Sequence, residues 1–453
     1  MIEFLRDRAR ADPGRPAVVT DQVSLTYRQL LDRAHSAAAG LRARGIARVG
    51  IADFEAPIVV PLLAGAALAG VEACVYPPDD AAALVALANR FDHGVLVSDR
   101  DDLDGVDVVR PGALLSSAAL SSAPPPGRTP RPHLVLTTGT TGAPRGVRHD
   151  WDRIVQAARR VKPEPAARWL LAYGLHQFAG LQVLVHVFAA GATLVAPAPR
   201  RPREGLAAMR VHAVDHASAT PTYWRFLLAE MRSDRGPVPG LKQITLGGEA
   251  IPGPLLDDLR EAFPAAEVSQ IYAASEFGAS SSIRDGRPGL PTGLLERGDD
   301  ADVALKVVDG ELWVRSRIGM LGYYGEEPVD AAGWRATGDL VELDGDRIRF
   351  RGRTSEIINV GGVKVHPLPI EERIAAVAGV DVARVYARPN AMTGSIVAVE
   401  VVVQQDVDTD RVDLAIREAC ADLPAAARPR SIRFVDVLVT QGEKIVRSVS
   451  GER

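Results

Sequence analysis

Helical and strand patterns alternate along most of the first 263 residues, and this alternation restricts the fold more than any other feature. Thr26 and Gln29 have capping-box spacing, apolar residues follow at helical period, and Gly45 stands where that helix should stop. Further helix or strand patterns lie at residues 48–54, 73–76, 81–90, 94–98, 133–136, 177–196, 221–231, 242–246 and 254–263. Helices that alternate with short apolar strands are typical of α/β folds. The sequence therefore predicts stacked α/β sheets.

The pattern changes near Val303, where short strands meet at Asp-Gly pairs. The pairs at 309–310 and 344–345 are signals for tight hairpins, so we expect a small β-barrel-like part here. After Arg353 a small α+β unit follows, with expected helices and strands at 367–377, 381–387, 395–403 and 410–423. These changes predict a large N-terminal domain over residues 1–352 and a small C-terminal domain over residues 357–453, with the boundary at residues 353–356.

Composition and charge exclude several classes of protein. The 53 basic and 57 acidic residues leave a net charge of −4, which disfavours a nucleic-acid partner. Cys74 and Cys420 are too far apart in sequence for a disulfide framework or a cysteine metal site, as expected in a reducing cytosol. The uncharged stretch 56–71 contains Pro61 and is shorter than the roughly 20 residues of a membrane span. The charged N-terminus opposes secretion, so we expect a cytoplasmic protein. We expect it to be a monomer or a homodimer.

The segment from Thr137 to Val147 follows an apolar strand and is rich in glycine and hydroxyl groups. Glycines allow the backbone to approach a ligand closely, while hydroxyls, amides and a fixed positive charge suit phosphate oxygens. It lacks the Gly-Lys-Ser/Thr of a Walker loop and the glycine pattern of a dinucleotide fold, which leaves a flexible turn as the plain alternative. The expected phosphate contacts are Thr137, Thr138, Gly139, Thr140, Thr141, Gly142 and Arg145.

This loop and several other motifs resemble those of the adenylate-forming superfamily, which contains acyl- and aryl-CoA synthetases, peptide-synthetase adenylation domains and luciferases. The loop of that family ends in Pro-Lys-Gly, and Arg145 stands at the lysine position here. Other family motifs follow in order at residues 25–30, 69–78, 247–249, 271–276, 337–340 and 352–353. The resemblance covers nearly the whole chain, and the joint order is more specific than any one motif.

The resemblance implies attack of a carboxylate on the α-phosphate of ATP, which concentrates negative charge at phosphorus. Glu276 would hold Mg²⁺, and Tyr272 would stack on adenine, although a tyrosine after a strand is often a core residue. Asp339 and Arg353 would bind the ribose hydroxyls, with a surface ion pair as the alternative. Lys444 would stabilise the developing charge, so it and Glu276 are the expected catalytic residues. Further ATP contacts are expected at Gly248, Glu249, Ala273 and Ser275.

The resemblance also implies a second reaction step and an acid pocket. Ser355 stands at the hinge position, and Gly361 and Gly362 would leave room for a thin pantetheine arm. The segment 173–178 has no aspartate to pair with a substrate ammonium, which favours an aryl or medium aliphatic acid over an α-amino acid. The expected pocket residues are His176, Phe178, Gly180, Tyr223 and Gly247, with core filling an equal alternative for His176.

We therefore expect an AMP-forming acid–thiol ligase that uses ATP and Mg²⁺ and transfers the acyl group to CoA. A ligase that loads the phosphopantetheine of a carrier protein, or another nucleophile, is the second hypothesis. A non-catalytic nucleotide-binding relative is the third, because Arg145, Ser355 and Glu443 depart from the usual family residues. The metal, ribose and lysine positions are all retained, which disfavours this third hypothesis.

Overall fold

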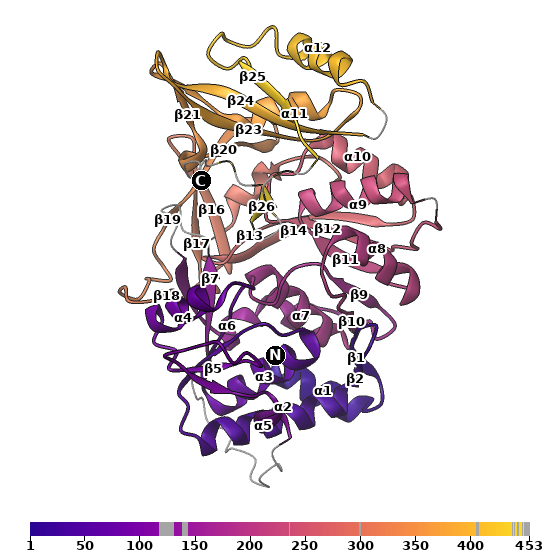
Figure 1. Cartoon of the computed structure of the whole chain (residues 1–453), viewed down its shortest axis with the longest axis vertical. Helices are drawn as coiled ribbons and strands as arrows, with labels where there is room; N and C mark the ends of the chain where they lie inside the picture. Colours follow the sequence, from indigo (N-terminus) through magenta and orange to yellow (C-terminus); the bar gives the residue numbers. More distant parts are fainter. Residues whose placement is uncertain are drawn as a thin grey trace.

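The computed structural model shows three sheets in the N-terminal part of the chain and a separate α+β unit at one end (Figure 1). At residues 280, 440, 441, 444 and 445 the structure describes the backbone but not the side chain. The structure describes residues 1–116, 131–137, 144–234, 236–298, 300–404, 407–436, 438, 440–441, 444–445 and 447. Most of the Ser- and Pro-rich stretch at 116–132 therefore lies outside the described residues. The predicted α/β class with a smaller C-terminal unit is confirmed.

The first sheet has eight strands, of which the inner six are parallel. In spatial order they are β14 (Gly278–Ile283), β13 (Glu267–Ala274), β12 (Gln243–Gly247), β11 (His216–Ala219), β9 (Arg168–Leu171), β10 (Thr193–Val195), β1 (Pro16–Val19) and β2 (Ser24–Thr26). The two edge strands, β14 and β2, are antiparallel to their neighbours. Because β11, β12 and β13 are parallel neighbours, their carboxyl ends meet at one edge of the sheet.

The second sheet has seven strands and contains the strand that leads into the predicted phosphate loop. Its order is β18 (Gly322–Tyr323), β8 (Arg145–Asp150), β7 (Pro132–Thr137), β4 (Glu72–Val75), β3 (Arg48–Ile51), β5 (Val95–Val97) and β6 (Asp107–Val109). β7 is parallel to β4 but antiparallel to β8, so the loop between β7 and β8 is a hairpin connection.

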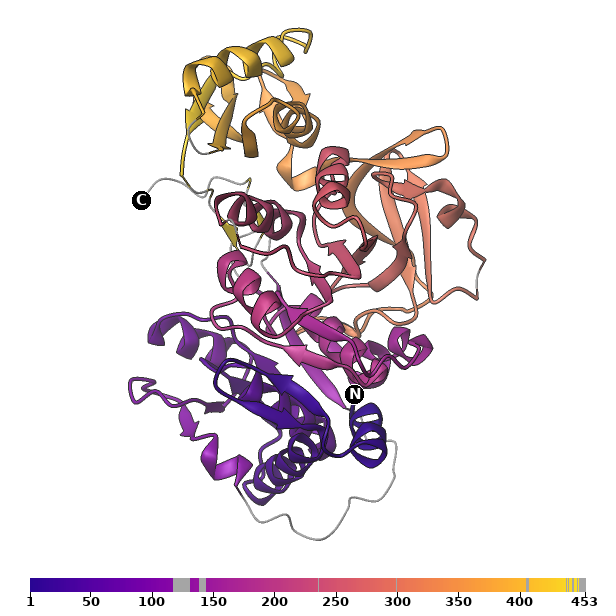
Figure 2. The same ribbon diagram turned by 90° about the vertical axis from the view of Figure 1, so that its right-hand side faces the viewer.

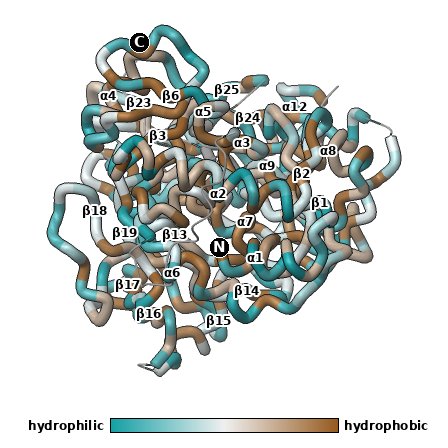
Figure 3. The backbone as a smooth tube through the Cα atoms, turned by 90° about the horizontal axis from the view of Figure 1, so that it is seen from below, coloured by the Kyte–Doolittle hydropathy of each residue, from teal (hydrophilic) through white to brown (hydrophobic). Residues whose placement is uncertain are grey.

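Helices fill the space between these two sheets and cover their outer faces. The inner layer consists of α1 (Ile2–Ala11), α2 (Tyr27–Ala43), α3 (Ala56–Ala69) and α7 (Phe178–Ala190). The outer helices are α4 (Ala81–Arg90), α5 (Gly112–Leu115), α6 (Trp151–Ile154), α8 (Pro202–Val211), α9 (Pro221–Ser233) and α10 (Gly253–Ala262), with 3₁₀ turns η1 (Ala157–Arg160) and η2 (Thr292–Glu296). Figure 3 shows hydrophobic stretches running through the inner layer, with hydrophilic loops at the periphery.

The apolar stretch at 56–71 forms α3, a helix that packs on α2 and is buried on nearly every side. Burial on all sides explains why this helix lacks a polar face. Among the described residues, no helix is both long and apolar enough to cross a membrane. The α2 helix begins with the predicted capping box, in which Thr26 and Gln29 bond each other's backbone N–H groups.

A five-stranded antiparallel sheet forms the predicted β-rich part of the N-terminal region. Its order is β15 (Leu290–Pro291), β20 (Arg347–Arg353), β19 (Arg335–Asp344), β17 (Glu311–Ser316) and β16 (Val303–Val308). Asp309 and Gly310 have φ values of 50° and 77°, as a tight hairpin between β16 and β17 requires. The second predicted hairpin joins β19 to β20 and places Asp339 opposite Arg353.

The C-terminal unit has its own apolar core and lies at one end of the molecule (Figure 2). It contains η3 (Thr354–Glu356), β21 (Ile358–Val360), β22 (Val363–Val365), α11 (Pro367–Ala375), β23 (Val380–Asn390), β24 (Gly394–Val403), α12 (Thr409–Ala419), β25 (Ser431–Phe434), β26 (Thr440–Gln441) and β27 (Lys444–Ile445). Val382, Val402 and Leu438 are buried against Phe226 of α9, and α11 contacts β20, so this unit packs on both α9 and the five-stranded sheet.

Candidate active site

Loops at the carboxyl ends of neighbouring strands bring several predicted residues together. Thr222 follows β11 and lies in the first turn of α9, where its N–H donates to Glu249 Oε2 at 3.0 Å. Tyr173, in the loop after β9, donates through its hydroxyl to the carbonyl of Gly247 at 3.3 Å. Gly248 lies between Gly247 and Glu249 with a φ of 86°. The predicted Gly-Gly-Glu segment is therefore fixed to the loops after β9 and β11 at the sheet edge where open α/β folds bind ligands.

Asp339 is held by two residues that the sequence predicts beside it. Tyr272 donates to Asp339 Oδ2 at 2.7 Å, and Arg353 Nε donates to Oδ1 at 2.9 Å. Asp339 is only 8% exposed, and burial together with its charge raises the pKa of Tyr272 well above the usual value. Each carboxylate oxygen can accept more than one hydrogen bond, so both retain capacity for a pair of ribose hydroxyls.

Aromatic rings surround Tyr272, which lies near the end of β13 just before Ala273 and Ser275. The centroid of its ring is 5.1 Å from that of Phe277 and 5.3 Å from that of Phe350. These contacts and the bond to Asp339 fix the plane of the Tyr272 ring, so it is preorganised to stack on a flat base.

Glu276 and Arg145 lie on either side of Tyr323, a residue that the sequence analysis did not single out. The Tyr323 hydroxyl donates to Glu276 Oε1 at 3.2 Å, and Arg145 Cζ lies 3.4 Å from the centroid of the Tyr323 ring. Arg145 also bonds Glu326 Oε1 at 2.7 Å. Burial and the charge of Glu276 raise the pKa of Tyr323 to about 12. A carboxylate and a guanidinium thus lie close together beside β8, where the phosphate loop ends.

Glu276 fits a Mg²⁺ ion that is shared with phosphate oxygens. In the part of the chain that the structure describes, no group of three or more His, Cys, Asp or Glu side chains could hold a metal ion. Mg²⁺ commonly keeps several waters and takes only one or two carboxylates together with substrate phosphates. A single carboxylate is therefore the donor set expected for a metal that arrives with ATP.

The predicted phosphate loop is described only at its two ends. Thr137 ends β7 and its hydroxyl donates to the carbonyl of Arg145 at 3.4 Å, which closes the base of the hairpin. The other predicted phosphate contacts lie outside the described residues: Thr138, Gly139, Thr140, Thr141 and Gly142.

Three of the predicted pocket residues lie together where α7 begins. The His176 ring folds over Gly174, and burial lowers the pKa of His176 to about 4, so the imidazole is neutral at pH 7. Phe178 stacks on His149 with ring centroids 5.0 Å apart. A Cβ atom at Gly180 would lie 2.2 Å from the carbonyl oxygen of Gly174, so only glycine fits there.

Tyr223 points in a different direction from these three residues. Its hydroxyl lies against Gly205 of α8, and the residue is 2% exposed within the core between α8, α9 and the first sheet. The structure therefore does not bring the Tyr223 side chain to His176 and Phe178. Its neighbour Thr222 is the residue that reaches the Gly-Gly-Glu segment.

The residues predicted for the second step lie on the C-terminal unit. Ser355 is the central residue of η3 and follows Arg353 by two positions. Gly361 and Gly362 form the turn between β21 and β22, where Gly361 N–H donates to the carbonyl of Thr393 at 2.9 Å. Both glycines have a positive φ, and no side chain approaches within 4 Å of a Cβ atom added at Gly362.

Lys444 lies in β27, and its backbone pairs with Gln441 of β26. Its side chain is outside the described residues, as are Gly442 and Glu443. Figures 1 and 2 both show β26, the partner strand of β27, beneath the C-terminal unit on the side of the N-terminal sheets. Arg447, three residues further on, was not predicted as a site residue but bonds both carboxylate oxygens of Glu371.

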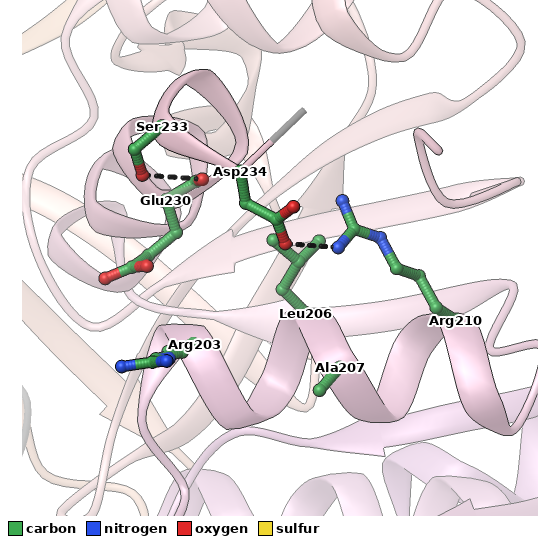
Figure 4. Close-up of a pocket in the computed structure, with 7 residues that line it drawn as sticks. All are labelled: Arg203, Leu206, Ala207, Arg210, Glu230, Ser233 and Asp234. Atoms are coloured by element: carbon green, nitrogen blue, oxygen red, sulfur yellow. Dashed lines mark hydrogen bonds and ion pairs between the residues drawn. The ribbon is translucent and has the colours of Figure 1, made fainter. Parts of the chain in front are cut away.

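A groove of about 380 Å³ lies away from these residues, between α8 and the end of α9 (Figure 4). Arg203 and Arg210 face Glu230 and Asp234 across it, and Arg210 Nη1 bonds Asp234 at 2.5 Å. The charges in this groove therefore neutralise one another, and none of the predicted site residues lines it.

Comparison with known proteins assigns the chain to a protein family. Residues 5–324, more than half of the chain, match the model of the AMP-binding enzyme family. The chain belongs to the AMP-binding enzyme family. It is 26% identical to a 2-succinylbenzoate–CoA ligase of Bacillus velezensis, with 93% of each chain covered. It is 25% identical to a medium/long-chain-fatty-acid–[acyl-carrier-protein] ligase of Mycobacterium tuberculosis, over 99% of this chain and 94% of the relative.

The fold of this AMP-binding family member also matches solved structures. The anthranilate CoA ligase AuaEII in complex with anthranoyl-AMP superposes with a TM-score of 0.84 at 20% identity, covering 98% of this chain and 95% of the other. The family also contains longer proteins: the chain matches the isonitrile lipopeptide synthase of Streptomyces coeruleorubidus at 28% identity but spans 33% of its length.

Proposed function

We propose that this chain activates a carboxylic acid with ATP to form acyl-AMP and pyrophosphate, and then transfers the acyl group to the thiol of CoA. Membership of the AMP-binding family and similarity to CoA and carrier-protein ligases over nearly the full chain make it an AMP-forming ligase. The observation that carries the proposal is the Asp339 site, where one buried carboxylate is preorganised by Tyr272 and Arg353 for a ribose.

The residues of the chain divide the work of the first step. Asp339 and Arg353 bind the ribose, and Tyr272 stacks on adenine. Glu276 holds Mg²⁺, which neutralises charge on the phosphates when it is bound. The Lys444 amine supplies positive charge to the oxygens around the α-phosphate in the transition state, as preorganised donors do at other anionic transition states.

The acid is proposed to be aryl or medium aliphatic. His176 is neutral and buried, Phe178 offers an aromatic face, and Gly180 keeps the backbone of α7 close to the loop before it. A neutral, mainly apolar pocket stabilises an uncharged acyl group better than an ammonium. An anthranilate ligase is among the structural neighbours, and its aryl substrate is of this class.

Transfer to a carrier protein is the alternative second step. The relative in Mycobacterium tuberculosis is an acyl-carrier-protein ligase that matches this chain almost end to end. Both acceptors present the same pantetheine arm, for which Gly361 and Gly362 are the proposed passage. We place a hinge at residues 353–356, centred on Ser355. A cytoplasmic location, supported by the free thiols of Cys74 and Cys420, belongs to the same proposal.

Exchange of labelled pyrophosphate into ATP, with Mg²⁺ and a panel of aryl, aliphatic and amino acids, tests this function. We expect exchange that depends on an aryl or aliphatic acid and not on an α-amino acid. Adding CoA or an acylatable carrier protein to the active acid then identifies the acceptor through the thioester formed. Absence of exchange across the panel would contradict the proposal and favour a non-catalytic nucleotide-binding protein.

Replacing Asp339 by alanine should raise the KM for ATP about 10- to 100-fold, because hydrogen bonds to a charged group contribute about 1.5–3 kcal/mol. Tyr272→Phe removes only the hydroxyl that orients the carboxylate, so a smaller rise is expected. Asp344→Ala is a matched control, since Asp344 lies on the same strand but is 62% exposed and pairs with Arg349. Steady-state exchange kinetics check this result. An unchanged KM in Asp339→Ala would remove the residue from the ATP site.

A further inference from the structure

Arg447 is held by carboxylates from two other elements of the C-terminal unit. Its Nε and Nη2 atoms donate to the two carboxylate oxygens of Glu371 on α11, at 2.8 and 2.7 Å. Its Nη1 atom donates to Glu356 Oε1 at 3.4 Å. The Arg447 and Glu371 side chains are 15% and 8% exposed. A two-point arginine–carboxylate pair fixes the direction as well as the position of the guanidinium.

Glu371 is itself fixed, so it is a rigid acceptor for Arg447. Its Oε1 atom accepts a hydrogen bond from the N–H of Val385 in β23 at 2.8 Å. Burial alone lowers the pKa of Arg447, but the charges of Glu371 and Glu356 outweigh burial and raise that pKa. Arg447 therefore stays charged, and the ion pair connects the backbone at Arg447 to the core of the C-terminal unit.

Arg447 lies close in sequence to Lys444, bonds a neighbour of the proposed hinge residue, and lines a cavity between the two parts of the chain. It follows Lys444 of β27 by three residues, and it bonds Glu356, which directly follows the proposed hinge residue Ser355. It also lines a small cavity between the two parts of the chain. The facing residues in that cavity are Thr222, Arg225 and Glu249 on one side and Leu368, Glu371 and Arg447 on the other.

The segment around β26 and β27 is attached on both sides. Leu438, six residues before Lys444, is 2% exposed in the cluster with Val382 and Val402. Arg447 provides the second attachment, three residues after the lysine. These two attachments restrict the backbone of the β26–β27 pair between them, and restriction before substrate binds is the requirement for a preorganised charge.

We propose that Arg447 is a positioning residue for acyl-AMP formation. By pairing with Glu371 it fixes the backbone of β27, the strand that carries Lys444. Arg447 touches no reacting atom and acts only through the lysine. This inference rests on the proposed function and on the role proposed there for Lys444.

Arg447→Gln is expected to lower the kcat of pyrophosphate exchange about 10- to 100-fold while the KM for ATP changes by less than about threefold. Because Arg447 acts through Lys444, adding Arg447→Gln to Lys444→Ala should cause no further loss. If the role of Arg447 were purely structural, Arg447→Gln would lower the activity of the wild type and of Lys444→Ala by the same factor. The double-mutant cycle therefore separates a positioning role from a structural one.

Three further variants complete the test. Glu371→Gln keeps an acceptor for the Val385 N–H but removes the charge, so it should reproduce the effect of Arg447→Gln. Arg447→Lys keeps the charge without the two-point geometry and should recover part of the lost kcat. Arg373→Gln is the matched control. Arg373 lies on α11, as Glu371 does, and pairs with Asp422, but its side chain is 42% exposed. We therefore expect wild-type exchange from this variant.

Thermal unfolding of each variant shows whether it is folded, and Glu371→Gln and Arg447→Lys carry the test if Arg447→Gln is not. A wild-type kcat in Arg447→Gln or Glu371→Gln would overturn the proposal. So would a further loss on adding Arg447→Gln to Lys444→Ala. The unmodified protein is assayed in parallel: its own failure to exchange contradicts the proposed function and this inference with it, whereas variant results against an active parent concern Arg447 alone.

Discussion

Lys444→Ala should lower acyl-AMP formation about 100- to 1,000-fold, the effect typical of removing one preorganised donor from an anionic transition state. In free energy this is about 3–4 kcal/mol of lost transition-state stabilisation. The ribose and adenine contacts come from Asp339, Arg353 and Tyr272, which lie on other elements, so ATP binding should largely survive. Pyrophosphate exchange measures the first quantity, and calorimetric titration with ATP measures the second.

The control for this variant is an exposed lysine in the N-terminal part of the chain. Lys162 is exposed in the loop after η1, far along the chain from the C-terminal unit, and Lys162→Ala should exchange like the wild type. If Lys444→Ala also forms acyl-AMP at the normal rate, Lys444 has no part in the mechanism. If it loses ATP affinity in proportion to rate, the lysine acts on binding and not on the transition state.

The sequence predicted most elements of the fold because each of them has a local signal. The capping box at Thr26 and the Asp-Gly pair at 309–310 specify a helix start and a hairpin without help from distant residues. The predicted strand at 48–54 was too long, since β3 ends at Ile51 and Asp53 adopts a φ of 63° that a strand cannot continue. β1, which lies between β10 and β2, was not predicted, because a strand of four residues is too short to show a clear pattern.

Among the site residues, those that lie in a recognisable motif were predicted and the others were missed. Tyr272, Asp339 and Arg353 lie in contiguous motifs, and the structure brings their side chains into contact. Tyr323 and Arg447 were missed because no role was assigned to their positions from a motif. Their contacts with Glu276 and Glu371 appear only in the structure.

Helix phase explains the placement of Tyr223. A motif stretch at 220–223 does not reveal which side chains face the core once α9 forms. In the helix, Tyr223, Trp224 and Leu227 turn inward, while Phe226 packs against the C-terminal unit and the backbone N–H of Thr222 bonds Glu249. Sequence position therefore identified the correct helix, and only the packing showed which of its residues approach the site.

Arg347→Ala is expected to destabilise the five-stranded sheet by about 1–3 kcal/mol, the cost of leaving buried polar groups without their hydrogen-bond partner. Arg347 is 1% exposed, and its Nη1 atom lies 2.5 Å from Asp285 Oδ2. Its other N–H groups donate to three backbone carbonyls of the loop before β15: Arg287, Pro288 and Gly289. Alanine would leave these carbonyls without their partner, whereas the Asp285 side chain is 36% exposed and can be solvated by water.

Arg349→Ala is the matched control for this change. Arg349 lies two residues further along β20, is 45% exposed and pairs with Asp344, so its loss should alter stability by less than about 1 kcal/mol. Urea unfolding followed by the fluorescence of Trp313 and Trp334, which lie in and beside this sheet, compares the two variants. Because β19 and β20 also carry Asp339 and Arg353, loosening the sheet should weaken ATP binding in Arg347→Ala well below its unfolding midpoint. Equal unfolding midpoints for the two variants would show that the buried arginine contributes no more than an exposed one, and that the ribose site does not depend on it.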